Sequence, residues 1–330
     1  MDNKAHYDGV TDAWKYILGD NLHYGYFDSS DIPLEKATNA LIEKLAALAK
    51  LNDCSSVLDV GCGTGTPAFY LYEKFGCSIA GISISPRGVE IAEEKCRAKQ
   101  YSGKIKFYVK DALDNGFAEN SFDIVWVMES SHLMRNKIKL FEENYRVLKK
   151  NGCMLLCDLI LINEFSVLDI YKYQKELATL EKSFGKAKME TLEFYKTKML
   201  KQGFQDIEVI DISNKAFPTL AKWKDNTRSN KDNILKFFSE NDFNNFLLSC
   251  DIISDFFSND TNIDHGNKSI HRSRDCLILL RCFGFMLSPN NEYCSEPRRP
   301  HGVLSYMIFV TVRPCFPKSL FIADGVQIHK

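Results

Sequence analysis

Residues 57–65 read Val-Leu-Asp-Val-Gly-Cys-Gly-Thr-Gly, a short apolar run that ends in three closely spaced glycines. Three glycines within five positions let the backbone turn sharply and approach a ligand that a Cβ atom would obstruct. A helical stretch begins near Thr66, so its first N–H groups are free to face that turn. The stretch therefore predicts a strand, a tight loop and a helix that together form a ligand site.

On both sides of this loop, short β-rich runs alternate with helical stretches. Such alternation predicts βαβ units around a mostly parallel sheet, which is an α/β doubly wound fold with helices on both faces. The run 122–128 is almost wholly apolar, as expected of a central strand that is covered on both sides. The predicted strands span 55–60, 77–83, 104–109, 122–128 and 153–161, and the predicted helices between them span 66–75, 86–99 and 137–149.

The chain before and after this core is mostly helical. Residues 1–52 contain an aromatic-rich helix, an ordered loop and an amphipathic helix from Leu34 to Leu51. Residues 53–161 form the predicted ligand-binding core. Residues 162–260 hold helices at about 165–184 and 188–202, a strand-like run at 204–212 and further helix to about Phe257. We expect the helices of 162–260 to form a lid over the ligand end of the sheet, beside the remaining core elements.

The last segment, residues 261–330, differs in kind. It holds five of the nine prolines and four of the seven histidines, and its periodicity is poor. We interpret it as an atypical C-terminal appendage of uncertain order. Two apolar runs in it, Cys276–Phe283 and Tyr306–Val312, are the candidates for one last strand.

Composition and charge limit the classes of protein and partner. The formal net charge is -1, and no basic cluster interleaved with aromatic residues occurs before residue 260, so a nucleic-acid partner is not expected. The longest apolar runs are too short or carry an Arg, so a membrane span is not expected either. There are eleven cysteines but no Cys-x-x-Cys, and the chain starts without an apolar secretory stretch. These features favour a reduced, cytoplasmic protein without a metal site.

The spacing of the glycines bears on the chemistry of the ligand. Dinucleotide enzymes use Gly-x-Gly-x-x-Gly and place an acidic residue at the end of the second strand. Here the third glycine follows the second by two residues, and the second strand ends in Gly81-Ile-Ser-Ile-Ser85 without an acid. Asp59 precedes Gly61 by two residues, where a carboxylate can orient the ammonium group of a zwitterion. The residues favour a methyl-donating cosubstrate over NAD, and a purely structural glycine turn is the third interpretation.

Further motifs along residues 5–260 join this loop in a recognisable set. They are Tyr7-Asp8 with Trp14, Leu22-His23-Tyr24-Gly25-Tyr26-Phe27, Val57–Gly65, Gly81–Ser85, Lys110-Asp111-Ala112, Phe122-Asp123, Met128–His132, and Arg146-Val147-Leu148 followed by Asn151-Gly152. The set resembles class I S-adenosylmethionine-dependent methyltransferases that act on small molecules, especially the group of natural-product O-methyltransferases, tocopherol methyltransferases and mycolic acid cyclopropane synthases. The resemblance implies a Rossmann-like sheet, S-adenosyl-L-methionine as the cosubstrate, and a small-molecule acceptor.

The same resemblance implies which residues bind the cosubstrate. One position departs from the family pattern, because Gly88 stands where the family often has a Gln near the ribose. The residues implied are Asp59, Gly61, Cys62, Gly63 and Gly65 for the methionyl part, Ile82 and Ser83 for the ribose, Asp111 and Ala112 for the adenine amino group, Glu129 for the shape of the site, and Tyr7, His23 and Tyr24 in the N-terminal segment that closes over the cosubstrate.

The candidate catalytic residues follow from the needs of methyl transfer. Transfer from a sulfonium is an in-line displacement, and a hydroxyl acceptor benefits from a general base near the methyl group. His132 follows the fourth strand and can accept a proton near neutral pH, and Asp158 closes the fifth strand and can pair with His132 or act alone. Glu129 is a third candidate and His23 an outside one. Alternatively, His132 only bonds the backbone and Asp158 only caps a turn.

Six aromatic residues of the predicted lid are numerous enough to enclose a hydrophobic acceptor, although aromatics at helical spacing are more often core residues. Three functions stay open at this point. The first is methylation of a hydroxyl on a small or medium lipophilic metabolite, the second is methylation of carbon or nitrogen, and the third is cosubstrate binding without turnover. The aromatic residues are Phe165, Tyr171, Tyr173, Phe184, Phe217 and Trp223.

Overall fold

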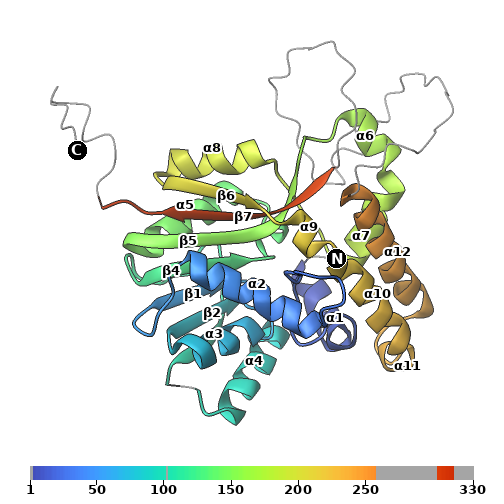
Figure 1. Ribbon diagram of the computed structural model, residues 1–330, viewed down its shortest axis with the longest axis horizontal. Coiled ribbons are helices and arrows are strands. Elements are labelled where there is room, and N and C mark those ends of the chain that lie inside the picture. The colour runs from blue at the N-terminus through green and yellow to red at the C-terminus, as the bar shows by residue number, and fades with distance from the viewer. Residues whose placement is uncertain (1–2, 102, 258–302, 316–330) are drawn as a thin grey trace.

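A computed structural model describes residues 3–101, 103–257 and 303–315 of the chain. Its centre is a seven-stranded sheet in the order β3-β2-β1-β4-β5-β7-β6, with helices packed on both of its faces (Figure 1). The predicted doubly wound α/β fold is therefore confirmed. The sheet is parallel from β3 to β5, whereas β7 runs antiparallel to both of its neighbours.

The elements follow one another along the chain with short connections. In order, they are α1 (Asn3–Ile17), α2 (Leu34–Leu48), β1 (Ser56–Val60), α3 (Thr66–Phe75), β2 (Ser78–Ser83), α4 (Pro86–Ala98), β3 (Ile105–Val109), β4 (Phe122–Met128), the 3-10 helix η1 (Ser131–Leu133), α5 (Lys137–Val147), β5 (Leu148–Leu161), α6 (Val167–Lys172), α7 (Gln174–Phe184), α8 (Leu192–Gln202), β6 (Gln205–Asp211), α9 (Ser213–Ala216), α10 (Pro218–Ser229), α11 (Lys231–Ile234), α12 (Glu240–Phe257) and β7 (Leu304–Val312).

The five strands predicted around the glycine loop are confirmed to within a few residues. Strand β5 begins at Leu148, earlier than the predicted 153, and the helix predicted over 165–184 is wrong as a single element. It is divided into α6 and α7 because Tyr173 leaves the helical backbone region, with φ -100° and ψ 17°. A capping box between Ser166 and Asp169 starts α6 separately.

Strand β7 lies within residues 261–330, the segment interpreted above as an atypical C-terminal appendage. Of the two runs offered for a last strand, Tyr306–Val312 lies in β7, and Cys276–Phe283 lies outside the described residues. Strand β7 pairs with β5 from Cys153 to Leu161 on one side and with β6 on the other. This part of residues 261–330 is therefore integral to the sheet and not an appendage to it.

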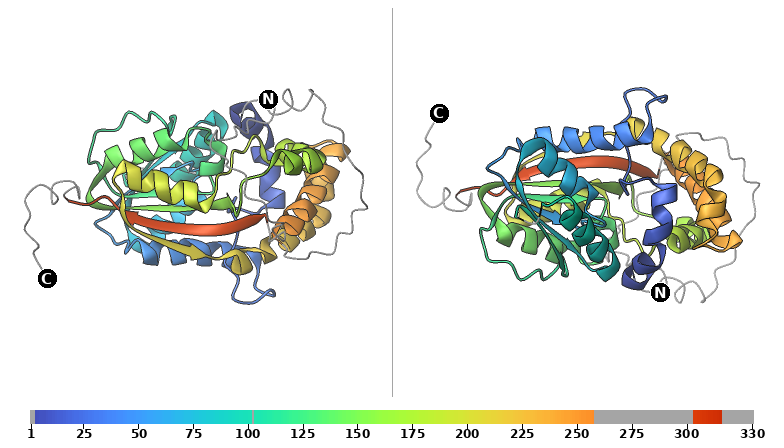
Figure 2. Two further views of the ribbon diagram at one scale, coloured as in Figure 1. Left: turned by 90° about the horizontal axis from the view of Figure 1, so that it is seen from above. Right: turned by 90° about the horizontal axis from the view of Figure 1, so that it is seen from below.

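Two apolar cores lie on the two faces of the sheet. Alternate strand residues point to opposite faces, so Leu58 and Val125 pack with α5 and α8, whereas Val57 and Ile124 pack with α2, α3 and α4. Views from above and below show the sheet between these two layers, with α1, α7, α10 and α12 grouped at one end of it (Figure 2). These helices enclose the end where the candidate site lies.

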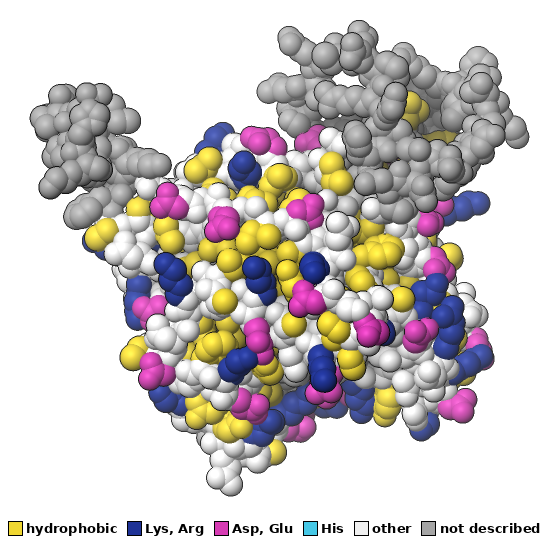
Figure 3. All heavy atoms as spheres, viewed as in Figure 1, with side chains coloured by type: hydrophobic (Ala, Val, Ile, Leu, Met, Phe, Trp, Pro, Cys, Tyr) yellow, Lys and Arg dark blue, Asp and Glu magenta, His cyan; other side chains and the backbone are white. Residues whose placement is uncertain are grey.

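The surface carries charges of both signs. On the face in Figure 3, basic and acidic side chains are interspersed with hydrophobic ones. In the described ranges, no helix is long and apolar enough to cross a bilayer, and no cluster of His, Cys, Asp or Glu is arranged to hold a metal ion. The eight cysteines in these ranges are all free thiols. The expectation that nucleic acid is not a partner stays a prediction.

Ending the chain after Val303 should prevent folding. The truncation removes β7 and leaves β5 and β6 with unpaired edges in the middle of the sheet. It also removes Phe309, which is fully buried in the core beside α8. We expect insoluble protein on expression, measured as the soluble fraction. A chain ended after Cys315 keeps β7 and is the control; a soluble Val303 truncation with a cooperative thermal transition would contradict the assignment.

Candidate active site

The glycine loop after β1 is held in left-handed backbone conformations. Gly61, Gly63 and Gly65 have φ values of 85°, 53° and 78°. A Cβ atom on Gly61 would lie 2.3 Å from the Cβ of Ser130, and one on Gly65 would lie 2.5 Å from the ring of Phe107. A Cβ on Gly63 would meet only Leu22, at 3.9 Å. Packing within the chain thus requires glycine at 61 and 65, whereas Gly63 leaves open space beside a cavity.

This cavity, called the cosubstrate cavity below, has a volume of about 380 Å³. It lies where β1, β2 and β4 end, with α1 across it, which is the usual ligand end of a doubly wound sheet. Gly88, the position that departs from the family pattern, also lines it. The predicted residues that line it are Tyr7, His23, Asp59, Gly61, Cys62, Gly63, Ile82, Ser83, Asp111, Ala112 and Glu129.

Two residues predicted to bind the cosubstrate, Gly65 and Tyr24, do not line the cosubstrate cavity. Gly65 is the N-cap residue of α3 and faces Phe107 instead. The ring of Tyr24 packs between Trp223 and Tyr306, at centroid distances of 4.7 and 5.1 Å. Tyr24 lines the neighbouring cavity described below, and its backbone N–H donates to Oε1 of Glu129 over 2.7 Å.

Asp59 is the buried carboxyl group of the cosubstrate cavity. Its Oδ2 has no hydrogen-bond partner among the described residues, and burial raises the pKa of Asp59 to about 7. An unpartnered buried carboxylate is costly unless a cation or donor meets it. The group therefore fits the ammonium of a methionyl ligand, and the open space at Gly63 fits its chain. The described residues are consistent with the cosubstrate that the resemblance implies.

His23 is buried in the wall of the same cavity. Its Nδ1 lies 2.7 Å from the carbonyl oxygen of Tyr24, which assigns the ring proton to Nδ1. Burial lowers the pKa of His23 to about 4, so the ring is neutral at pH 7. Its Nε2 has no partner among the described residues. His23 thus offers a hydrogen-bond acceptor and no positive charge.

Glu129 stands between two cavities. It follows β4 with a left-handed φ of 48°, and its Oε1 accepts hydrogen bonds from the backbone of Tyr24 and the hydroxyl of Tyr306. Burial raises the pKa of Glu129 to about 8, although these two donors oppose the shift. Glu129, Tyr7, Trp14 and Leu22 line both the cosubstrate cavity and a second cavity.

The second cavity, called the acceptor cavity, has a volume of about 140 Å³. His132 and Asp158 lie in its wall, and most of the remaining wall is apolar. Of the six aromatic residues expected to enclose an acceptor, only Phe184 and Trp223 line it. Tyr171 and Phe217 are exposed instead, and Phe165 and Tyr173 pack against Phe256. The apolar wall comprises Leu18, Leu22, Leu177, Leu180, Phe184, Ala187, Met189, Trp223, Ile253 and Leu304.

His132 and Asp158 form a hydrogen-bonded pair. Nδ1 of His132 lies 2.7 Å from Oδ1 of Asp158, and the backbone N–H of His132 donates to Oδ2 over 3.0 Å. The hydroxyl of Ser131 and the N–H of Leu159 also donate to this carboxylate. Burial alone would raise the pKa of Asp158, yet His132 and these donors hold it below its usual value. Asp158 is therefore ionised and fixes the orientation of the imidazole.

Lys137 ties the turn that carries His132 to the loop after α7. The side chain is almost fully buried, and its Nζ donates to the carbonyls of Met134 and Lys188, the latter over 2.7 Å. The N–H of Lys188 in turn donates to the carbonyl of His132 over 2.7 Å. Burial lowers the pKa of Lys137 to about 8. Ala187 and Met189 flank this bond and line the acceptor cavity, so Lys137 holds the two walls together.

Local sequence patterns give no sign of the roles of Tyr306, Lys137 and Tyr195. Ser131 belongs to the Met128–His132 motif, but the motif assigns it no role of its own. Tyr306 lies far along the chain from Glu129, and Tyr195 lies far from Ser131, whose Oγ is 2.9 Å from its hydroxyl. Only the fold brings such pairs together. Lys137 carries no motif, because a buried lysine looks in sequence like any other helical lysine.

Known proteins resemble this chain in sequence and in fold. The family model described as "Methyltransferase domain" matches residues 57–152. Methyltransferase GfsG of Streptomyces halstedii is 30% identical over 65% of this chain and 76% of its own length. The 27-O-demethylrifamycin SV methyltransferase of Amycolatopsis mediterranei is 29% identical over 66% of this chain and 78% of its own length.

A solved structure shares the fold of this chain over most of its length. The mycolic acid cyclopropane synthase CmaA1, determined with S-adenosylhomocysteine and CTAB, superposes with a TM-score of 0.72 over 94% of this chain and 96% of its own, at 16% identity. At this identity the likeness shows the fold alone. Together with the sequence relatives, it agrees with the Rossmann-like methyltransferase sheet described above.

Replacing Asp59 by Asn should weaken binding of S-adenosylhomocysteine by about 10- to 100-fold, because the variant lacks the charge that meets the ligand's ammonium group. In the wild type, affinity should fall about tenfold from pH 8 to pH 6 as the carboxyl group, with its pKa about 7, becomes protonated. Calorimetry at several pH values measures both effects. Asp53→Asn, an exposed change outside the cavity, is the control.

The same variant should be more stable without ligand. The pKa of Asp59 is higher in the folded chain than in the unfolded one, so folding binds a proton and its stability falls as pH rises from about 4 to 7. Asp59→Asn removes this loss and should raise the Tm of the ligand-free protein at pH 8. A wild-type affinity that does not change between pH 6 and 8 would contradict the role of Asp59.

Replacing Lys137 by Met should loosen the wall of the acceptor cavity. The change leaves the carbonyls of Met134 and Lys188 buried without their donor, which costs about 1–3 kcal/mol of unfolding free energy. We expect a lower urea midpoint and faster amide exchange at Lys188. Lys139→Met, an exposed change on the same helix, is the matched control. If both variants were equally stable and equally protected, Lys137 would not hold this loop.

Proposed function

The chain belongs to the S-adenosylmethionine-dependent methyltransferases that act on small molecules, and from this premise we propose that it methylates a hydroxyl group of a small or medium lipophilic metabolite. The observation that carries this proposal is the His132–Asp158 pair in the wall of a mostly apolar cavity. A hydroxyl must lose its proton as it is methylated, and a positioned imidazole is the usual side chain for that task.

The roles of the residues follow from this geometry. Asp158 keeps the ring proton of His132 on Nδ1, so that Nε2 has a free lone pair for the proton of an acceptor hydroxyl. The side chain of His132 is 17% exposed, enough for an acceptor to reach it and little enough to limit water. When bound, the cosubstrate supplies an electrophilic methyl group on a sulfonium. Asp59 would hold its ammonium group, and Gly61 to Gly63 would border its methionyl chain.

The walls of the acceptor cavity support a lipophilic acceptor. Leu177, Leu180 and Phe184 of α7 face Trp223 of α10 and Ile253 of α12 across it. Apolar walls exclude water from the methyl group and strengthen the charge interactions of the site. The relative that acts on a demethylrifamycin carries an oxygen position in its name, which is consistent with a hydroxyl acceptor. Methylation of nitrogen or carbon is the alternative outcome of the test.

The test is transfer of a labelled methyl group from S-adenosylmethionine to a pool of phenols, alcohols and amines, with the product identified by NMR. A methyl ether supports the proposal, and a methylamine or a new carbon–carbon bond overturns it. S-adenosylhomocysteine should also raise the Tm of the wild type at concentrations well above its Kd.

His132→Ala and Asp158→Asn test the base. We expect kcat to fall by about 10²- to 10⁴-fold for His132→Ala, because the hydroxyl then keeps its proton, and by less for Asp158→Asn, which misorients the ring. The affinity for S-adenosylhomocysteine should stay unchanged in both. Asp225→Asn, a change at an exposed aspartate, is the control. An unchanged kcat in both variants would refute the assignment.

A further inference from the structure

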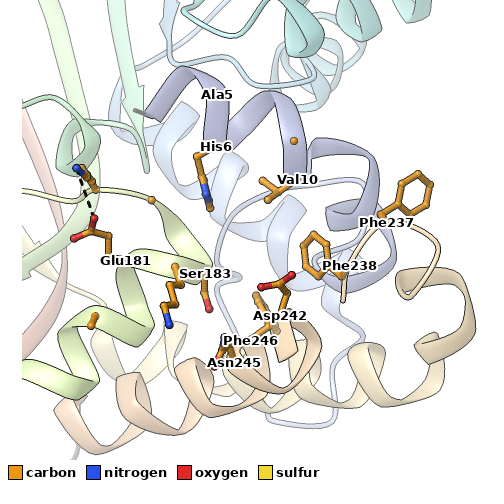
Figure 4. A pocket seen from close by; sticks show the side chains of 15 residues that line it. Ala5, His6, Val10, Glu181, Ser183, Phe237, Phe238, Asp242, Asn245 and Phe246 are labelled. Carbon is orange, nitrogen blue, oxygen red and sulfur yellow. Dashed lines mark ion pairs between the residues drawn. The ribbon is translucent and has the colours of Figure 1, made fainter. Parts of the chain in front are cut away.

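A third cavity lies on the far side of α1 from the cosubstrate cavity. It has a volume of about 560 Å³ and lies between α1, α7, the segment after α11, and α12 (Figure 4). We call it the outer cavity. None of its lining residues has a role in the function proposed so far, apart from two that it shares with the acceptor cavity.

Helix α1 is the wall between two cavities. Tyr7, Thr11 and Trp14 line the cosubstrate cavity, whereas His6 and Gly9 line the outer cavity. Residues three or four apart share a helix face, so these two sets occupy different faces of α1. Trp14 and Ile17 of α1 also belong to the apolar core, with Tyr7 and Val10 packed against it, whereas His6 and Gly9 are not part of that core.

Gly9 is unexplained by packing or by backbone conformation. It lies in the middle of α1, where glycine destabilises a helix relative to alanine. A Cβ atom at this position would meet nothing within 4 Å, and the residue does not have a positive φ. The chain itself therefore does not need glycine at position 9. Gly9 is exposed and lines the outer cavity, so the missing side chain leaves the wall of the cavity open at this point.

Two polar side chains of the outer cavity lack partners. His6 is 8% exposed, and its Nε2 has no hydrogen-bond partner among the described residues; the same holds for Nδ2 of Asn245 on α12. Figure 4 shows His6 directed from α1 into the space that α12 borders. Burial lowers the pKa of His6, so the ring is neutral and one nitrogen can accept a hydrogen bond. A buried polar group without a partner favours a ligand that supplies one.

The outer cavity adjoins the acceptor cavity. Glu181 and Gly185 line both, and a Cβ on Gly185 would lie 3.2 Å from the ring of His6. The acceptor cavity, at about 140 Å³, is smaller than the 300–1,000 Å³ or so that is common for drug-sized ligands, whereas the outer cavity falls within that range. An acceptor of drug size would therefore need space beyond the acceptor cavity, and the outer cavity is next to it across Glu181 and Gly185.

The charges around the outer cavity balance. Glu181 and Lys186 form an ion pair of 3.8 Å, and Asp242 and Lys182 add one charge of each sign to the wall. Phe237, Phe238 and Phe246 supply apolar surface. The lining thus favours neither an anion nor a cation. A hydroxyl group both donates and accepts, and so suits the free atoms of His6 and Asn245.

We propose that the outer cavity binds the distal, neutral, hydroxyl-bearing end of an elongated acceptor whose reacting hydroxyl lies in the acceptor cavity. The proposal rests on the proposed function and adds the class of acceptor: a molecule with a hydroxyl for methylation at one end, a lipophilic middle and a second hydroxyl at the other end.

Three para-alkoxyphenols test this with protein saturated with S-adenosylhomocysteine. Two have a six-carbon chain and differ only in a terminal hydroxyl, and the third is para-methoxyphenol. Calorimetry should show the terminal hydroxyl compound binding about fivefold tighter than its unsubstituted partner, because its hydroxyl meets the unpartnered atoms of His6 and Asn245 in the outer cavity. Each should bind with one molecule per chain.

Substitutions in the outer cavity test whether the terminal hydroxyl binds there. Asn245→Leu should abolish the advantage of the terminal hydroxyl, and Asn244→Leu, an exposed change on the same helix, should keep it. Gly9→Leu adds a bulky side chain to the wall of the outer cavity and should weaken binding of both long phenols about tenfold, with para-methoxyphenol and S-adenosylhomocysteine unaffected. Gly9→Ala, whose methyl group meets open space, is its control and should bind both nearly as the wild type does.

Three results would overturn the proposal. They are equal affinity of the two long phenols for the wild type, no binding of the terminal hydroxyl compound, or two molecules of para-methoxyphenol per chain, which would assign the cavity to a separate ligand. A different measurement, labelled methyl transfer, tests the proposed function. Labelled methyl transfer to nitrogen or carbon would overturn hydroxyl methylation, while an intact terminal-hydroxyl effect would leave distal binding in the outer cavity standing.

Discussion

The arrangement of the site depends on the buried carboxylate of Asp158. It lies in β5 with no exposed surface, and such a charge is tolerated only where hydrogen bonds surround it. It accepts them from His132, Ser131 and Leu159, and Ser131 is hydrogen-bonded in turn to Tyr195 of α8. The need to solvate one carboxylate thus joins a strand, a turn and a helix, and the imidazole is oriented as part of that network.

Three carboxyl groups at the ends of adjacent strands differ in how far the chain satisfies them. Asp158 accepts four hydrogen bonds, and its pKa is lowered. Glu129 accepts two hydrogen bonds and has a pKa of about 8. Asp59 has an oxygen without a donor and a pKa of about 7. A carboxylate whose hydrogen-bond donors all come from the chain, such as Asp158, is suited to orienting a neighbouring side chain. A buried carboxylate without donors, such as Asp59, is suited to binding a ligand that carries a positive charge. The number of donors therefore separates Asp158, which we propose positions a base, from Asp59, which we propose binds the cosubstrate.

Most strands of the sheet, and many of the residues that line the cosubstrate cavity, could be predicted from the sequence. Local patterns define the strands up to β5, because each is a short apolar run bounded by turns, and the left-handed turn at Gly61 follows from its glycines. The contact of Tyr306 with Glu129 had no local signal, because it depends on where an antiparallel strand enters the sheet after a long separation in sequence. Helical spacing also does not tell which aromatic faces inward: Phe184 lines the acceptor cavity, whereas Tyr171 lies at the surface, and tertiary packing alone decides between them.

Helix α1 couples the cavities mechanically. One of its faces closes the cosubstrate cavity through Tyr7 and Trp14, which also line the acceptor cavity, and another face borders the outer cavity through His6. A rigid helix cannot shift toward one cavity without changing the others, since its backbone hydrogen bonds fix the faces relative to each other. In the proposed function, cosubstrate and acceptor would therefore be bound at the same position of α1. Each ligand would then stabilise that position for the other, and such a linkage is reciprocal even when the ligands occupy different cavities.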